Sequence, residues 1–236
     1  MYKNYLFDLY GTLINIKTDE EKSSFWKGLA QFYSFNGAPY EGLELKLIYL
    51  QKIREKKEGN LKTKYPEVKL VEVITEMYWE KGIKPSLELI IHTTQFFRIT
   101  STEYIKLYDG VIKFLDILKG RGKKLYVLSN AQREFTLPEL DYLGIAKYFD
   151  GIYISSDYEI CKPDIQFINE LIKREKLSVK ESIMIGNDHI ADVGVATGVG
   201  MDCLYIHSNL SQELESTPKC KYTIMDGDLK DIWHQI

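Results

Sequence analysis

Four short polar segments of the sequence lie where predicted strands end. In chain order they are Asp8, Ser129-Asn130, Lys162-Pro163 and Gly186-Asn187-Asp188. The carboxyl ends of parallel strands meet at one edge of a sheet, so we expect these side chains to share one crevice. A carboxylate can attack phosphorus covalently, while a hydroxyl, a backbone N–H group and an ammonium group can hold the oxygens on which charge develops. Because two carboxylates can also hold a hard divalent cation, these residue types indicate a phosphate-transfer site.

The elements that must position these residues alternate between strand and helix. An apolar run over residues 2–7 predicts a first strand, and from residue 109 onward short apolar runs alternate with helical patterns. Further strands are expected at 124–128, 151–154, 182–185, 203–206 and 222–225, and helices at 111–118, 137–143, 165–176 and 191–199. This alternation predicts an α/β domain in which helices cover both faces of a doubly wound parallel sheet.

A helical segment separates the first strand from this alternation. Between residues 18 and 98, apolar side chains recur at helical spacing in four stretches, at 25–33, 43–53, 68–81 and 87–97. An insert of roughly 80 residues is too long for a plain connection in a compact domain. We therefore predict a helical domain at residues 16–99, inserted into a core made of residues 1–15 and 100–236.

Composition argues against several classes of protein. Of the 236 residues, 44% are apolar and 28% charged, as in ordinary globular proteins. The formal net charge of -3 argues against nucleic acid or an anionic membrane as a partner, and no apolar run is long enough to span a bilayer. The N-terminal apolar stretch contains an acidic residue and no cleavage pattern, so we interpret it as a strand and not as a signal peptide. Three widely spaced cysteines favour a reduced, cytoplasmic protein without structural zinc, and the oligomeric state stays open.

The polar segments also resemble the four sequence motifs of the haloacid dehalogenase superfamily. These segments are DLYGTL at residues 8–13, LSNA at 128–131, KPD at 162–164 and GNDHIAD at 186–192. The resemblance covers nearly the whole chain, because the sequence leading into LSNA and the ATGVGM run at 196–201 are similar as well. The helical insert lies where one subclass of the superfamily carries an α-helical cap. The resemblance thus implies a Rossmann-like core with an inserted helical cap.

The resemblance assigns the nucleophile and the metal ligands. Asp8 is the expected nucleophile, and Asp8, the backbone carbonyl of Tyr10 and Asp188 are the expected ligands of Mg²⁺. Asn187 is a further candidate ligand, because the alignment of the fourth motif is ambiguous by one residue. The implied reaction runs through an aspartyl-phosphate on Asp8, and the implied partner is a small phosphorylated molecule.

The remaining motif residues are expected to bind phosphate. By the resemblance, Ser129, the backbone N–H of Asn130 and Lys162 hold the phosphate oxygens, and Lys162 also belongs to the catalytic set. Asp192 is expected to lie behind them, where it orients Lys162 or a metal-bound water.

Tyr10 departs from the pattern of the superfamily's phosphatases, which carry a second Asp two residues after the nucleophile. A phenol with a pKa near 10 is a poor general base at neutral pH, and loss of such a group costs on the order of 10²–10⁴-fold in rate. DLYGT is also how the metal-free 2-haloacid dehalogenases of the superfamily spell this motif. Asp188 as an acidic ligand, and the absence of Arg from residues 14–44, favour a magnesium-dependent phosphatase. A 2-haloacid dehalogenase, or a protein that binds a phosphorylated ligand without turnover, stays as the alternative.

Overall fold

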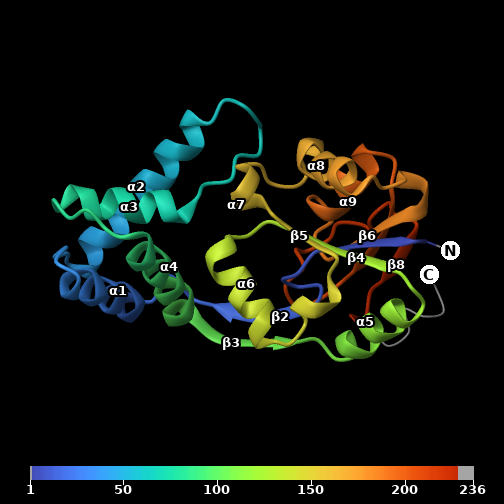
Figure 1. The fold of residues 1–236 in the computed structure, drawn as a ribbon, viewed down its shortest axis with the longest axis horizontal. Coiled ribbons are helices and arrows are strands. Elements are labelled where there is room, and N and C mark those ends of the chain that lie inside the picture. The colour runs from blue at the N-terminus through green and yellow to red at the C-terminus, as the bar shows by residue number, and fades with distance from the viewer. Residues whose placement is uncertain (1, 228–236) are drawn as a thin grey trace.

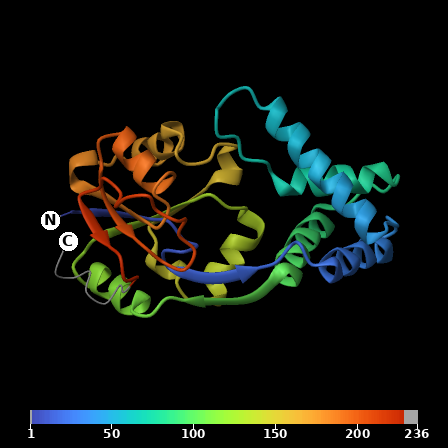
Figure 2. The same cartoon turned by 180° about the vertical axis from the view of Figure 1, so that it is seen from behind.

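The core of the protein is a six-stranded parallel sheet. The computed structural model describes residues 2–227 and is drawn from two sides in Figure 1 and Figure 2. The strands lie in the order β5-β4-β1-β6-β7-β8. Their bounds are β1 Asn4–Phe7, β4 Lys124–Ser129, β5 Gly151–Ile154, β6 Ser182–Gly186, β7 Asp202–Ile206 and β8 Tyr222–Ile224. β1 lies between β4 and β6, with Phe7 in register with Val127 and Ile185.

Helices cover both faces of this sheet. Side chains along β1 point alternately to either face, so neighbouring residues of β1 pack against different helices. Tyr5 and Phe7 pack with apolar residues of α5 (Val111–Gly120) and α6 (Arg133–Tyr142). Leu6 packs on the other face with α8 (Ile165–Glu175) and α9 (Asp192–Gly198). Figure 1 shows α5 on one side of the sheet and α8 and α9 on the other. The shorter elements are η1 Ala146–Tyr148, α7 Ser155–Tyr158 and η2 Val179–Glu181. The predicted doubly wound α/β fold is therefore confirmed.

Four helices form the segment inserted after β1, as the apolar spacing predicts. They are α1 Ser23–Phe35, α2 Gly42–Gly59, α3 Leu70–Glu80 and α4 Leu87–Ser101. The rings of Phe25, Trp26 and Phe97 meet edge to face, with centroids 4.9 to 6.2 Å apart. Such aromatic pairs stabilise a core by about 0.5–1.5 kcal/mol each beyond the area they bury. The four helices thus share an apolar core of their own, at the end of the molecule away from the sheet (Figure 1).

A two-stranded antiparallel ribbon connects this helical unit to the sheet. β2 (Ile14–Thr18) pairs with β3 (Thr102–Leu107), so that the chain leaves and re-enters the core side by side. The sequence pattern does not predict either strand. Their hydrogen-bonding partners lie about 90 residues apart, and short ribbons carry too few alternating positions for a clear period.

Helix α6 begins at Arg133, four residues before the predicted start. The early start is tolerated although Pro138 lies inside the helix and cannot donate to the carbonyl of Glu134. The side-chain amide of Gln95, on α4, donates to that carbonyl at 3.1 Å. A residue of the helical unit therefore satisfies the acceptor that the proline leaves open.

A second connection joins the helical unit to the core between α2 and α3. The N–H of Glu67 donates to the carbonyl of Glu159 at 3.1 Å, and the N–H of Cys161 donates to the carbonyl of Tyr65 at 2.8 Å. We call this pairing of residues 65–67 with 159–161 the docking ladder. The side chain of Gln132 supports it by donating to the carbonyl of Val68 at 2.8 Å. The ladder ends directly before Lys162, so the helical unit is hydrogen-bonded to the backbone that immediately precedes one of the four polar segments.

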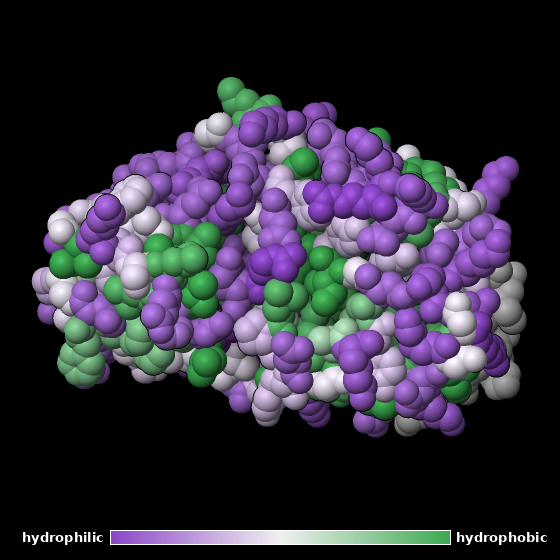
Figure 3. Space-filling view, in the orientation of Figure 1, coloured by the Kyte–Doolittle hydropathy of each residue, from purple (hydrophilic) through white to green (hydrophobic). Residues whose placement is uncertain are grey.

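On the face drawn in Figure 3, hydrophilic side chains predominate, and apolar ones form separate patches on both the helical unit and the core. Within residues 2–227, none of the helices combines the length and hydropathy of a bilayer-spanning segment.

Candidate active site

Asp8 lies at the carboxyl edge of the sheet, one residue beyond β1. Its N–H donates to the carbonyl of Ile185 at 2.9 Å, so the backbone still follows β6 at this point. The chain then turns sharply, because the carbonyl of Leu9 accepts from the N–H groups of Leu13 and Ile14, both at 2.8 Å. Gly11 takes the turn with φ at +89°, a region that favours glycine. The Asp8 side chain is consequently held between β4 and β6, with 8% of the residue exposed.

Two of the predicted side chains contact Asp8 directly, and a third contacts one of these two. The ammonium of Lys162 lies 2.7 Å from Asp8 Oδ1 and 2.6 Å from Asp192 Oδ1. The hydroxyl of Ser129 donates to Asp8 Oδ1 at 3.3 Å. Asn130 fixes the lysine from the backbone side, since its Oδ1 accepts the N–H of Lys162 at 2.8 Å and its Nδ2 donates to the carbonyl of Lys162 at 3.1 Å. The second and third polar segments thus contact Asp8, and Asp192, at the end of the GNDHIAD segment, is joined to Asp8 through Lys162.

The buried charges of this cluster favour a permanently charged lysine. Burial alone lowers the pKa of Lys162, but the negative charges of Asp192 and Asp8 outweigh it and raise the pKa above its ordinary value. Burial raises the pKa of the Asp192 carboxyl, and the contact with Lys162 opposes that rise. A fixed cation beside Asp8 can bind the oxygens of an anionic substrate, and Asp192 holds this cation in place.

Asn187 lies against the loop that carries Asp8. Its Oδ1 accepts a hydrogen bond from the hydroxyl of Thr12 at 3.1 Å, and the same hydroxyl lies 3.4 Å from Asp8 Oδ2. A Cβ at Gly11 would come within 2.3 Å of the Asn187 amide nitrogen, so only glycine leaves room for this contact. Thr12 therefore links the first and fourth polar segments.

Asp188 uses its carboxylate mainly within its own loop. Its Oδ1 accepts the N–H groups of Ile190 and Ala191, both at 2.8 Å, just before α9 begins. Its Oδ2 lies 3.5 Å from the side-chain nitrogen of Gln212. Of the two candidates in the fourth segment, Asn187 is the one whose side chain is joined to Asp8 through a shared neighbour.

The donor atoms available near Asp8 suit a hard cation. They are carboxylate, amide and peptide oxygens, without sulfur or imidazole among the predicted ligands. In residues 2–227 no three or more His, Cys, Asp or Glu side chains are grouped to hold a metal ion. Mg²⁺ does not require such a group, because it keeps several water ligands and commonly binds through one or two carboxylates. The residues present therefore fit Mg²⁺ and do not form a closed cage for it.

Tyr10 turns its hydroxyl toward α6. The hydroxyl donates to Glu139 Oε2 at 2.5 Å and lies 3.0 Å from Thr136 Oγ1. Burial, followed by the negative charge of Glu139, raises the pKa of Tyr10 well above its ordinary value. The phenol is therefore a poor acid or base in this arrangement, in agreement with the expectation from its ordinary pKa.

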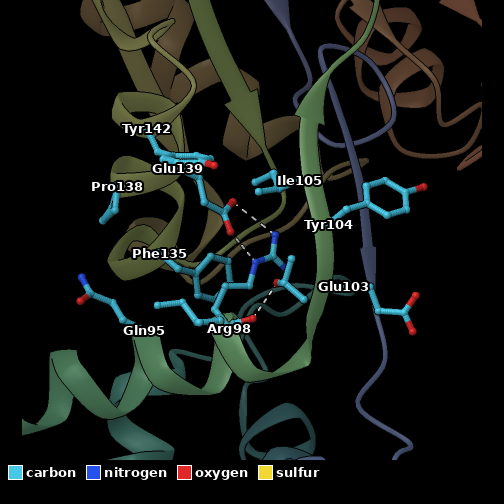
Figure 4. Close-up of a pocket in the computed structure, with 11 residues that line it drawn as sticks. Gln95, Arg98, Glu103, Tyr104, Ile105, Phe135, Pro138, Glu139 and Tyr142 are labelled. Atoms are coloured by element: carbon cyan, nitrogen blue, oxygen red, sulfur yellow. Dashed lines mark hydrogen bonds and ion pairs between the residues drawn. The ribbon is translucent and has the colours of Figure 1, made fainter.

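A cavity of about 630 Å³ lies next to this part of α6. Figure 4 shows its lining, which comes from α4, β3 and α6. The lining residues are Gln95, Arg98, Ile99, Thr102, Glu103, Tyr104, Ile105, Phe135, Pro138, Glu139 and Tyr142. The cavity borders Glu139, and neither Asp8 nor Lys162 is part of its wall.

The comparisons with known proteins agree with this geometry. The sequence pattern of the haloacid dehalogenase-like hydrolases matches residues 5–206. The chain belongs to that family. This hydrolase is 26% identical to the glyceraldehyde 3-phosphate phosphatase of Methanocaldococcus jannaschii over 95% of the chain and 93% of that relative. It is 32% identical to the enzyme of the same name from Methanothermobacter thermautotrophicus, in a match that spans 40% of the chain and only 42% of that relative. The 2-haloacid dehalogenase of Pseudomonas syringae has the same fold, with a TM-score of 0.65 at 19% identity over 99% of this chain and 97% of that one.

Two sets of residues around the site of this hydrolase are not predicted from the sequence. Thr12 lies inside the DLYGTL segment, and its position four residues after Asp8 in a tight turn is a signal that could have identified it. Arg98 and Glu139 carry no such signal, because their contact joins two helices that are adjacent only in the folded chain.

Proposed function

We propose that this hydrolase cleaves phosphate monoesters of small metabolites, with Asp8 as the nucleophile. The observation that carries the proposal is the contact of Asp8 Oδ1 with both Lys162 Nζ and the Ser129 hydroxyl. A phosphoryl group attacked by Asp8 has its oxygens within reach of these two donors. Two relatives named as glyceraldehyde 3-phosphate phosphatases support a substrate of this class.

The proposed hydrolysis has two steps. Asp8 attacks phosphorus while the bond to the ester oxygen breaks, which leaves an acyl phosphate on Asp8 and an alkoxide that takes a proton from water. A water molecule then attacks the same phosphorus, so that the acyl phosphate bond breaks, Asp8 is regenerated and inorganic phosphate departs. Lys162 and Ser129 hold the oxygens on which charge develops in both steps, and the backbone N–H of Asn130 is proposed to do the same.

The helical unit completes the proposed site. We propose that residues 16–99 act as a cap that covers the substrate and supplies specificity, while residues 1–15 and 100–236 carry the chemistry. A screen of phosphorylated metabolites for phosphate release, with and without Mg²⁺, tests the proposed function directly. Release that requires both the metal and Asp8 is the expected result, and the absence of release from every phosphate ester would contradict it.

We further propose that Mg²⁺ is the cofactor and that Asp8, the carbonyl of Tyr10 and Asn187 are its protein ligands. The bound cation would neutralise charge on the phosphoryl oxygens. Asp188 is the alternative ligand, favoured by its charge, whereas Asn187 is favoured by its contact with Thr12.

Calorimetric titration with Mg²⁺ distinguishes Asn187 from Asp188 as the ligand. The Asn187→Ala variant should bind Mg²⁺ at least about tenfold more weakly, as expected for loss of an oxygen ligand. The Asp188→Asn variant should bind nearly as the wild type does, and the opposite order would reverse the assignment.

A second function is favoured by one observation. The side chains of Tyr10 and Asn187 are both uncharged, which also suits metal-free release of halide from a 2-haloacid, because halide leaves without a proton.

Replacing Tyr10 by Asp distinguishes phosphate-ester hydrolysis from dehalogenation. If the chain is a phosphatase that lacks its acid, the Tyr10→Asp variant should cleave alkyl phosphates at least about tenfold faster than the Tyr10→Asn variant, because both lose the contacts of the phenol and only the carboxyl group can transfer a proton.

The gain should be small for aryl phosphates, whose phenolates leave readily without a proton. Tyr10→Asn is the matched control, because asparagine has nearly the same shape as aspartate but cannot transfer a proton in this way. Both substrates and 2-chloropropionate are measured on all three proteins. Halide release by the wild type without metal would replace the phosphatase proposal by the dehalogenase. No turnover of either kind would favour a protein that binds a phosphorylated ligand.

A further inference from the structure

Three parts of the chain meet at the carboxylate of Glu139. Oε2 accepts from the hydroxyl of Tyr10, on the loop after β1, at 2.5 Å. Oε1 accepts from Nε of Arg98, on α4 of the helical unit, at 2.6 Å, and Oε2 accepts from Nη2 of the same guanidinium at 3.3 Å. Figure 4 shows Arg98 reaching from α4 to Glu139 on α6. The Asp8 loop, the core and the helical unit thus share one carboxylate.

This junction holds its members in one geometry. The side chains of Arg98 and Glu139 are only 14% and 13% exposed, so little water competes for their hydrogen bonds. The guanidinium also lies over two aromatic rings, 5.0 Å from the ring centre of Tyr10 and 4.5 Å from that of Phe135. A planar guanidinium that is paired with a carboxylate at two points and stacked on rings has few alternative orientations. Tyr10 is therefore clamped at both its ring and its hydroxyl.

The clamp acts close to the nucleophile along the chain. Tyr10 follows Asp8 by two residues and precedes Gly11 and Thr12, the residues that touch Asn187. Fixing the ring and the hydroxyl of Tyr10 limits the positions open to these peptide units, because the side chain and the turn are joined at one Cα. The pair Arg98–Glu139 is in turn present only while α4 lies against α6.

We propose that Glu139 is a positioning residue of the proposed hydrolase reaction: it fixes Tyr10, and thereby the Asp8 loop, when Arg98 of the helical unit is docked against it. The inference rests on the proposed function, because it assigns Glu139 a role in a reaction that Asp8 carries out. It makes docking of the helical unit a condition for the correct position of the nucleophile. Glu139 acts through Tyr10 and touches no reacting atom.

A double-mutant cycle between Glu139→Gln and Tyr10→Phe tests this role. Each single variant should lower kcat by between about tenfold and 10²-fold with KM little changed, as misplacement of reacting groups does. In the Tyr10→Phe background, Glu139→Gln should cause a much smaller loss than it does alone, because the hydroxyl through which it mainly acts is already absent. Asp141→Asn, which removes an exposed carboxylate from the same helix, is the matched control and should keep the activity of the wild type. Losses that simply multiply in the double variant would overturn the proposal.

A measurement that needs no turnover separates this inference from the proposed function. A hydroxyl proton in a short bond to a buried carboxylate exchanges slowly, and it should give a downfield proton resonance in the wild type. The resonance should vanish in Tyr10→Phe and persist in Asp141→Asn. Its absence from the wild type overturns the positioning role even if the enzyme is active. Its presence in a protein that turns over no phosphate ester and no 2-haloacid overturns the proposed function instead.

Discussion

Replacing Asp8 by Asn should reduce phosphate release by about 10⁵-fold or more, since removal of a covalent nucleophile leaves only the catalysis that comes from binding. The amide has nearly the shape of the carboxylate but cannot attack phosphorus. It also keeps an oxygen that can accept from the Ser129 hydroxyl and from Lys162. The fold should therefore survive. Steady-state phosphate release and thermal unfolding measure the two effects.

Trapping of the intermediate gives this prediction a positive control. During turnover of the wild type, hydroxylamine should convert an acyl phosphate on Asp8 to a hydroxamate, which mass spectrometry locates on the peptide that contains residue 8. The Asp141→Asn variant should give the same modified peptide. A hydroxamate at another carboxylate, or an Asp8→Asn variant that keeps its activity, would show that the nucleophile lies elsewhere.

Replacing Lys162 by Met should destabilise the protein as well as inactivate it. The side chain of Lys162 is 1% exposed and its ammonium bonds to two carboxylates, of which Asp192 is 2% exposed. Removing one partner of a buried ion pair costs about 3–5 kcal/mol, because the remaining charge stays buried and uncompensated. At about 2–4 °C per kcal/mol for a chain of this length, the midpoint of thermal unfolding should fall by roughly 10 °C. The loss of an oxyanion donor should lower kcat by about 10²–10³-fold.

Two further variants test the physical reason for this loss. Lys173→Met removes an exposed lysine from α8 and should leave both stability and activity unchanged. Adding Asp192→Asn to Lys162→Met removes one of the two carboxylates that are left without a cation. The double variant should therefore recover part of the lost stability without regaining activity. A Lys162→Met variant as stable as the wild type would mean that the charges around Asp8 are solvated.

Much of the site could be predicted because its residues stand at the ends of strands. The alternation of strand and helix places Asp8, Ser129 and Lys162 at one edge of a parallel sheet, and the contacts around Asp8 agree with that placement. The sequence favours Asp188 as the metal ligand, with Asn187 as a further candidate, whereas the contact with Thr12 favours Asn187. Both follow β6, and the choice depends on which side chain the following turn directs toward Thr12.

The parts that could not be predicted depend on contacts distant along the chain. β2 forms only because β3, some 90 residues later, returns beside it. The start of α6 depends on Gln95, which occupies the carbonyl that Pro138 leaves without a donor. Arg98 and Glu139 belong to helices whose individual patterns contain no information about their relative position. Each of these features follows from tertiary packing, which overrides local propensity.

The docking ladder sets an energy scale for opening the enzyme. It consists of two backbone hydrogen bonds, at 2.8 and 3.1 Å, and such bonds contribute about 0.5–1.5 kcal/mol each net of solvation. Together they contribute about 1–3 kcal/mol, and opening costs more than this because the Arg98–Glu139 pair between α4 and α6 must separate as well. One strand of the ladder leads directly into Lys162, so breaking the ladder would loosen the chain next to the proposed phosphate-binding lysine. If residues 16–99 act as the proposed cap, entry of substrate and departure of product would depend on this same opening, on the microsecond-to-millisecond timescale of lid motions.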